Sequence, residues 1–167
     1  MTPAQHSHCS YCGSAYATTP WPRHCAGCGE TTWRNPLPVA VAVLPVLTAQ
    51  GLGVVVQRRD IEPARGLLSL PGGFIEHGED WRAALVRELW EETGLEAAAD
   101  TVNLIDVRSA PSGGTIMIFG ELPARRIEEL PVSAPTPEST EWLVVTEPIG
   151  LAFSTHSEVL AAYLARH

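Results

Sequence analysis

The segment from Asp80 to Thr93 constrains the fold of this chain more than any other part of it. Its residues predict a helix that is apolar almost all round, which is typical of a buried helix, and Gly94 is placed to end it. The segment nevertheless contains three glutamates, Glu88, Glu91 and Glu92. Glu88 and Glu92 project within about 40° of each other, on the same face as Leu85. Burying such carboxylates without partners is costly, so the helix must provide partners for them.

Two interpretations of these glutamates follow from the helix alone. In the first, they form a solvated acidic face that pairs with basic neighbours. In the second, they bind a hard divalent cation such as Mg²⁺ or Mn²⁺, which takes oxygen ligands from carboxylates, backbone carbonyls and water. Helical geometry by itself leaves both interpretations open, and the residues on either side of the helix separate them.

Those flanking residues resemble the signature of the Nudix hydrolases. The signature is Gly, five residues, Glu, seven residues, and then Arg-Glu-aliphatic-x-Glu-Glu-x-Gly-aliphatic. The stretch from Gly73 to Leu95 matches every specified position over 23 residues. The resemblance implies metal-dependent hydrolysis of the diphosphate bond in a nucleoside diphosphate that is linked to another group. It also implies that the helix and its two flanking loops carry the catalytic metal.

The resemblance further implies roles for individual residues. The expected ligands of Mg²⁺ or Mn²⁺ are the backbone carbonyl of Gly72 and the carboxylates of Glu88, Glu91 and Glu92. Arg87 would orient these carboxylates through charge-assisted hydrogen bonds, together with Glu79. The general base is either Glu88 itself or a loop glutamate outside the signature, and Glu138 and Glu141 are the candidates. The alternative is that both loop glutamates are exposed charges without a catalytic role.

Four cysteines near the start of the chain form a second motif: Cys9, Cys12, Cys25 and Cys28. Twelve residues separate the two Cys-x-x-Cys pairs, and four thiolates in this pattern suit the tetrahedral coordination of Zn²⁺. The pattern resembles a zinc ribbon, with two disulfides or a redox pair as the alternatives. Because so short a segment buries little core, structural zinc would supply its folding energy. We therefore expect a zinc ribbon over residues 1–35.

The rest of the chain, residues 36–167, predicts a Nudix domain of the α+β class. Apolar and β-branched stretches predict strands over residues 37–47, 51–59, 67–70, 102–110, 115–122 and 141–146. Helices are expected over residues 80–93 and 157–166. Strands and helices are interspersed without a regular βαβ repeat, which indicates a mixed sheet. The resemblance implies the α/β/α sandwich of the Nudix fold.

The signature does not specify the substrate, so other segments must narrow it. Residues 66–73, 114–119 and 151–154 resemble zinc-ribbon Nudix enzymes that hydrolyse FAD or ADP-ribose. NADH pyrophosphatases, including those that act on NAD-capped RNA, also have a zinc ribbon. Their Ser-Gln-Pro-Trp-Pro-Phe-like motif is missing here between residues 106 and 115. FAD, ADP-ribose or a related dinucleotide is the expected substrate. An NADH-type pyrophosphatase and a non-catalytic nucleotide-sensing module are the alternatives.

Three further residues are candidates for substrate binding. Arg58 and Arg59 end a predicted strand, where one of them could meet a phosphate. Phe74 could stack on an adenine or flavin ring, although large aromatic side chains are more often part of a core. The alternative for the two arginines is that they are solvated at the end of the strand, and the sequence supports this equally well.

Composition narrows the partners and the location. The formal net charge is −8, which argues against a nucleic acid partner that binds through charge. A small-molecule nucleotide is the expected partner, and related enzymes often form a homodimer. No apolar run approaches the roughly 18 residues of a membrane span, and residues 1–10 lack the features of a signal peptide. We expect no membrane partner and a cytoplasmic protein, in which cysteines bind metal more often than they form disulfides.

Overall fold

The computed structural model describes residues 5–17 and 20–167 of the chain. The chain divides into two compact units, Met1–Pro36 and Leu37–His167. Among the described residues, no helix has both the length and the apolar character that crossing a membrane requires.

Two similar turns, which begin at Cys9 and Cys25, organise the first unit. In each turn a glycine four residues later donates its amide N–H to the cysteine carbonyl, at 3.0 Å for Gly13 and 2.9 Å for Gly29. Both glycines have a positive φ, 74° and 80°, a conformation that costs glycine little. The unit also contains two short antiparallel strands, β1 (Arg23–His24) and β2 (Thr31–Thr32). The two turns place each Cys-x-x-Cys pair on a loop of the same shape.

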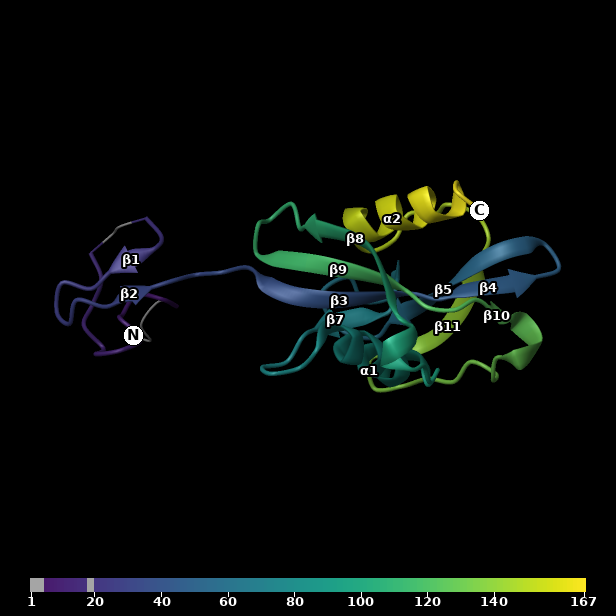
Figure 1. The fold of residues 1–167 in the computed structure, drawn as a ribbon, viewed down its shortest axis with the longest axis horizontal. Helices are drawn as coiled ribbons and strands as arrows, with labels where there is room; N and C mark the ends of the chain where they lie inside the picture. The colour runs from purple at the N-terminus through teal and green to yellow at the C-terminus, as the bar shows by residue number, and fades with distance from the viewer. Residues whose placement is uncertain (1–4, 18–19) are drawn as a thin grey trace. The chain divides into compact units, whose positions relative to one another are not determined.

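Two sheets and two α-helices make up the second unit (Figure 1). The strands of the first sheet are β3 (Leu37–Val43), β7 (Gly72–Phe74), β8 (Asn103–Ser109) and β9 (Thr115–Glu121). The strands of the second sheet are β4 (Pro45–Thr48), β5 (Gly51–Arg59), β6 (Leu68–Ser69), β10 (Arg125–Arg126) and β11 (Ser139–Val145). The helices are α1 (Trp81–Thr93) and α2 (Ser154–Leu164), with 3-10 turns η1 (Ala99–Thr101) and η2 (Ile127–Glu129).

Both sheets of the second unit are mixed. The first sheet has the order β7-β3-β9-β8, in which β3 is parallel to β9 and the other neighbours are antiparallel. The second has the order β10-β4-β5-β11, with β6 also paired to β5, and β10 is parallel to β4. Strand β5 is therefore the hub of the second sheet, because it pairs with β4, β6 and β11. The α+β class predicted from the sequence is confirmed.

The alternation of side chains along β3 creates a core on each face of the sheets. Ala40 and Ala42 belong to a buried cluster that includes Leu85 and Leu89 of α1. The intervening valines, Val41 and Val43, belong to a second cluster that includes Val159 and Leu160 of α2. Figure 1 shows the two helices on opposite sides of the sheets. Because strand side chains alternate between faces, one continuous apolar strand serves both helices.

The structure differs most from the sequence prediction at two boundaries. The single strand expected over residues 37–47 is divided between the two sheets, with β3 ending at Val43 and β4 beginning at Pro45. Proline has no N–H for a strand ladder, which accounts for a break at this position. Helix α2 begins at Ser154, three residues earlier than expected, and its first turn buries Thr155 and His156.

Helix α1 has the ends that its sequence predicts. The side chain of Asp80 caps the helix by accepting a hydrogen bond from the Arg82 amide at 2.9 Å. Gly94 ends it in the left-handed conformation, with φ 72°. These caps satisfy backbone groups that a helix leaves unpaired at its ends. They fix the length of α1 and therefore the positions of its glutamates.

Candidate active site and metal centre

Glu92, in the last turn of α1, is an almost fully buried carboxylate, with 2% of the residue exposed. Its Oε1 accepts a hydrogen bond from Gln57 Nε2 at 3.1 Å, and its Oε2 accepts one from the Gly72 amide N–H at 2.8 Å. Burial raises the pKa of Glu92 to about 8, even though the Gly72 N–H favours the charged form. Two neutral donors therefore orient this carboxylate without neutralising it.

Glu88 lies one turn before Glu92 and packs against the glycine that opens the signature. A Cβ on Gly73 would overlap the carboxylate of Glu88, so this position admits no side chain unless the carboxylate moves. Burial raises the pKa of Glu88, while its contact with Arg87 acts in the opposite direction. The close approach explains why the signature requires glycine here.

Arg87 joins the loop before the helix to the glutamates on it. Its guanidinium donates from Nε and Nη2 to the two carboxylate oxygens of Glu79, each at 2.9 Å, and from Nη2 to the Phe74 carbonyl at 3.0 Å. Its Nη1 donates to Glu88 Oε1 at 2.7 Å. The hydrogen bond to Arg87 lowers the pKa of Glu79 and raises that of Arg87. The bidentate contact with Glu79 fixes the guanidinium of Arg87, and the guanidinium in turn fixes one oxygen of Glu88.

Glu91 occupies a different environment from the other two helix glutamates. Its side chain is 42% exposed, and its carboxylate meets Arg87 Nη1 at 3.3 Å. Within residues 5–17 and 20–167, the carboxylates of the three glutamates do not converge as the four cysteine sulfurs do, which all lie within 4.8 Å of one another. Glu88 and Glu92 are thus buried, whereas Glu91 lies at the protein surface.

The groups around Glu88 and Glu92 fit a divalent metal of the Mg²⁺ or Mn²⁺ type. Their donor atoms are carboxylate oxygens, the ligands that hard cations prefer. The negative charge of Glu88 adds to the effect of burial in raising the pKa of Glu92, so the pair gains from a cation between them. Gly72 contacts Glu92 of this pair through its amide N–H.

The structure distinguishes the two loop glutamates that the sequence leaves equivalent. After burial, which is the main cause, the negative charge of Glu138 contributes to the raised pKa of both Glu88 and Glu92. Glu138 is therefore an electrostatic neighbour of the buried carboxylates. The carboxylate of Glu141 instead forms an ion pair with Arg58 Nε at 2.7 Å.

The adjacent arginines at the end of β5 also differ. Arg58 is held by its ion pair to Glu141 and by a hydrogen bond to the Gly66 carbonyl at 3.1 Å. Arg59 is 8% exposed, and its guanidinium lies 5.3 Å from the ring centroid of Phe153. Across the described part of the chain, Arg59 has no carboxylate within ion-pair distance. Its positive charge nevertheless acts to lower the pKa of Glu92, so Arg59 is an electrostatic neighbour of this carboxylate.

Two other residues complete the description of this region. Phe74, at the end of β7, is 56% exposed, so its ring is available to a ligand. Gln57, which the sequence analysis missed, contacts Glu92 from β5. Its only signal in the sequence is that a polar side chain directly follows three valines in a predicted strand.

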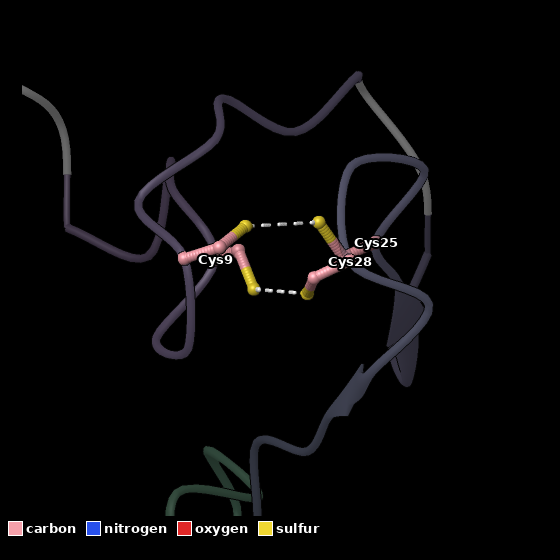
Figure 2. Close-up of side chains that lie close together, drawn as sticks. Cys9, Cys25 and Cys28 are labelled. Carbon is pink, nitrogen blue, oxygen red and sulfur yellow. Dashed lines mark hydrogen bonds between the residues drawn. The ribbon is translucent and has the colours of Figure 1, made fainter.

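The four cysteines converge in the first unit. The Sγ atoms of Cys9 and Cys28 are 3.8 Å apart, and those of Cys12 and Cys25 are 3.6 Å apart. Figure 2 shows the sulfurs facing one another across a small space. A tetrahedron with Zn–S bonds of about 2.3 Å has edges of about 3.8 Å, whereas a disulfide needs about 2.05 Å. The cluster therefore fits a zinc ribbon and not two disulfides.

The NUDIX domain family matches residues 36–161, and the chain belongs to this family. The Nudix family expected from the sequence is confirmed. A NUDIX hydrolase structure from Nitrosomonas europaea aligns with a TM-score of 0.72 and 23% identity, covering 96% of this chain and 92% of that one. The NUDIX domain of Shewanella oneidensis NrtR, complexed with ADP ribose, aligns with a TM-score of 0.65 and 20% identity, covering 80% and 88%.

Curated relatives match over shorter segments. The ADP-ribose pyrophosphatase of Methanocaldococcus jannaschii is 39% identical over 72 residues, which are 43% of this chain and 41% of the relative. The RNA pyrophosphohydrolase of Roseobacter denitrificans is 47% identical over 66 residues, which are 40% of this chain and 39% of the relative. The NAD-capped RNA hydrolase NudC of Chromobacterium violaceum is 32% identical over 95 residues, 54% and 34% of the two chains. The chain thus spans less than half the length of each relative.

The cysteine cluster predicts about one zinc ion per chain in freshly purified, reduced protein. Replacing Cys25 by serine should remove most of this zinc, because a hydroxyl is a much poorer ligand than a thiolate. Elemental analysis by mass spectrometry, normalised to protein concentration, measures both. Absence of zinc from the wild-type protein would contradict the zinc ribbon.

Proposed function

We propose that this chain hydrolyses the diphosphate bond of a nucleoside diphosphate linked to another group, such as ADP-ribose or FAD, in a reaction that requires Mg²⁺ or Mn²⁺. The observation that carries the proposal is the buried pair of carboxylates, Glu88 and Glu92, held against Gly73 and Gly72. Their pKa values are raised by burial, as expected of groups that gain a cation partner.

The residues that would hold the cation are Glu88, Glu91 and Glu92, together with the Gly72 carbonyl. When bound, Mg²⁺ or Mn²⁺ would offset the charge of the phosphates and lower the pKa of the attacking water. Arg87 keeps one oxygen of Glu88 in place through its contact with Glu79. This arrangement orients the ligands before the substrate arrives, so that little reorganisation is needed during the reaction.

Glu138 is our choice for the general base. Its charge is already felt by both buried carboxylates, and no ion pair occupies it among the described residues. Glu141 is engaged by Arg58, and one oxygen of Glu88 is engaged by Arg87 at 2.7 Å. Glu138 would accept the proton of the attacking water.

Two residues are proposed to bind the substrate. Arg59 is 8% exposed, its charge acts on Glu92, and among the described residues it pairs with no carboxylate. Its Nε donates to the Pro63 carbonyl at 2.9 Å, and its other N–H groups suit a phosphate oxygen. The exposed ring of Phe74 suits an adenine or flavin base. Because Arg58 is occupied by Glu141, we assign phosphate binding to Arg59.

ADP-ribose is the first substrate to test, because the M. jannaschii relative is named for it. That relative is 39% identical over a segment of 72 residues, which is 43% of this chain. The relatives named for RNA and for NAD-capped RNA make RNA, with or without an NAD cap, the second candidate. The net charge of −8 disfavours a long RNA that binds through its phosphates.

A substrate panel with Mg²⁺ tests the proposed reaction. The wild-type protein should cleave ADP-ribose to AMP and ribose 5-phosphate, or FAD to AMP and FMN, as resolved by chromatography. The double variant Glu91→Gln, Glu92→Gln should lose several kcal/mol of transition-state stabilisation, or roughly a thousandfold in rate. Full activity in the double variant would refute the metal assignment. Tight binding of a nucleotide that survives uncleaved with Mg²⁺ would indicate a sensing module instead.

Glu138→Gln and Glu141→Gln form a matched pair, since both replace a loop glutamate by its neutral isostere. We expect Glu138→Gln to lower kcat roughly 10²- to 10⁴-fold, with a small change in KM, because a general base is lost. Glu141→Gln removes a partly exposed ion pair, which contributes about 0–1 kcal/mol to stability and nothing to proton transfer. Steady-state kinetics at saturating Mg²⁺ measures both. Equal losses, or a larger loss for Glu141→Gln, would rule out Glu138 as the base.

A further inference from the structure

Gln57 is a fully buried amide in the middle of the fold. It lies in β5 directly after Val54, Val55 and Val56, and all four residues are 0% exposed. An amide in such a place is unfavourable unless its hydrogen-bonding groups find partners. Its presence in this apolar strand therefore needs an explanation.

The Nε2 group of Gln57 uses both of its N–H bonds. One is donated to Ser69 Oγ at 3.0 Å and the other to Glu92 Oε1 at 3.1 Å. The opposite end of the same amide is less well satisfied, because Gln57 Oε1 is buried with no hydrogen-bond partner among the described residues. A side chain that leaves its acceptor unpaired is not explained by the stability of the strand. The function of Gln57 must lie in what its donors hold.

The Gln57 contact is part of a set that fixes Glu92 from three strands. Gly72 in β7 donates its amide N–H to Oε2 at 2.8 Å. Ser139 in β11 donates its hydroxyl to the backbone carbonyl of Glu92 at 2.7 Å. Each carboxylate oxygen thus receives one hydrogen bond from a neutral donor, and each keeps an acceptor site for another partner.

The neutrality of these donors distinguishes Glu92 from Glu88. Glu88 is oriented by the cationic guanidinium of Arg87, which partly offsets its charge. Gln57 and Gly72 orient Glu92 through neutral donors, which offset none of its charge when the carboxylate is ionised. Donors that orient a metal ligand in this way belong to the shell of residues around a metal site that tunes its affinity.

We propose that Gln57 is a positioning residue, which holds the Glu92 carboxylate in the orientation required to bind the catalytic divalent cation. This inference rests on the proposed function, because it requires that Glu92 be a metal ligand. It adds to the proposed metal site a residue that lies outside the signature helix, in strand β5.

The experiment measures Mn²⁺ binding without catalysis, by electron paramagnetic resonance of free Mn²⁺. Gln57→Leu keeps the approximate size of the side chain and removes the donor, and we expect the dissociation constant for Mn²⁺ to rise roughly 10- to 100-fold. The control is Ser69→Ala, which disturbs the same amide but leaves its contact with Glu92, and it should bind Mn²⁺ much as the wild type does. Equal affinities of Gln57→Leu and wild type would overturn the proposal.

The dependence of rate on Mg²⁺ separates positioning from general damage to the fold. If Gln57 acts through metal affinity, kcat of Gln57→Leu should return close to the wild-type value at saturating Mg²⁺. A kcat that stays low at saturation, with unchanged Mn²⁺ affinity, would show a structural role only. If the wild type itself does not bind Mn²⁺, the proposed function fails; if the wild type binds and the variant binds equally, only the role of Gln57 fails.

A measurement on the wild-type chain covers the case in which Gln57→Leu does not fold. The side-chain amide of Gln57 gives a pair of ¹H–¹⁵N resonances, which are assigned from the intact protein. Titration with diamagnetic Mg²⁺ should shift these resonances along with those of the Gly72 amide, because both donate to Glu92. Gln57 resonances that stay fixed while Gly72 moves would contradict the proposal.

Discussion

The central constraint on this structure is the burial of one carboxylate, that of Glu92, in the last turn of α1. Glu92 is 2% exposed and carries a raised pKa, so the surrounding fold must supply everything that water would otherwise supply. It does so with neutral donors from Gln57 and Gly72 and with the charge of Arg59 at a longer distance. A divalent cation bound at the same place would complete this compensation.

The arrangement of the sheets explains why these donors meet. The alternating side chains of β3 build one core under α1 and another under α2, so α1 lies firmly against the sheet face and its last turn is fixed. Strand β5 reaches the same turn through Gln57, and β7 reaches it through Gly72. The caps at Asp80 and Gly94 then determine which turn of α1 faces these strands. Packing and capping together set the position of the carboxylates.

Much of the fold and of the candidate site was predictable from the sequence. The features that were not predictable depend on contacts between distant parts of the chain. The helix and its end at Gly94 follow from local spacing, as do the cysteine pairs. The break at Pro45 and the early start of α2 at Ser154 depend on which sheet or core each residue joins. Gln57 and Glu138 are far from the signature helix in sequence, so their relation to Glu92 depends on long-range strand pairing. Local patterns contain no record of such contacts.

The central claim is that Glu88 and Glu92 are shaped to hold a divalent cation. A crystal structure of the wild-type protein grown with Mn²⁺, with anomalous diffraction data, tests it most directly. The account predicts an anomalous peak within direct coordination distance of carboxylate oxygens of both glutamates, with Gln57 still donating to Glu92. A peak elsewhere, or Mn²⁺ bound while Glu92 is turned away from it, would contradict the account.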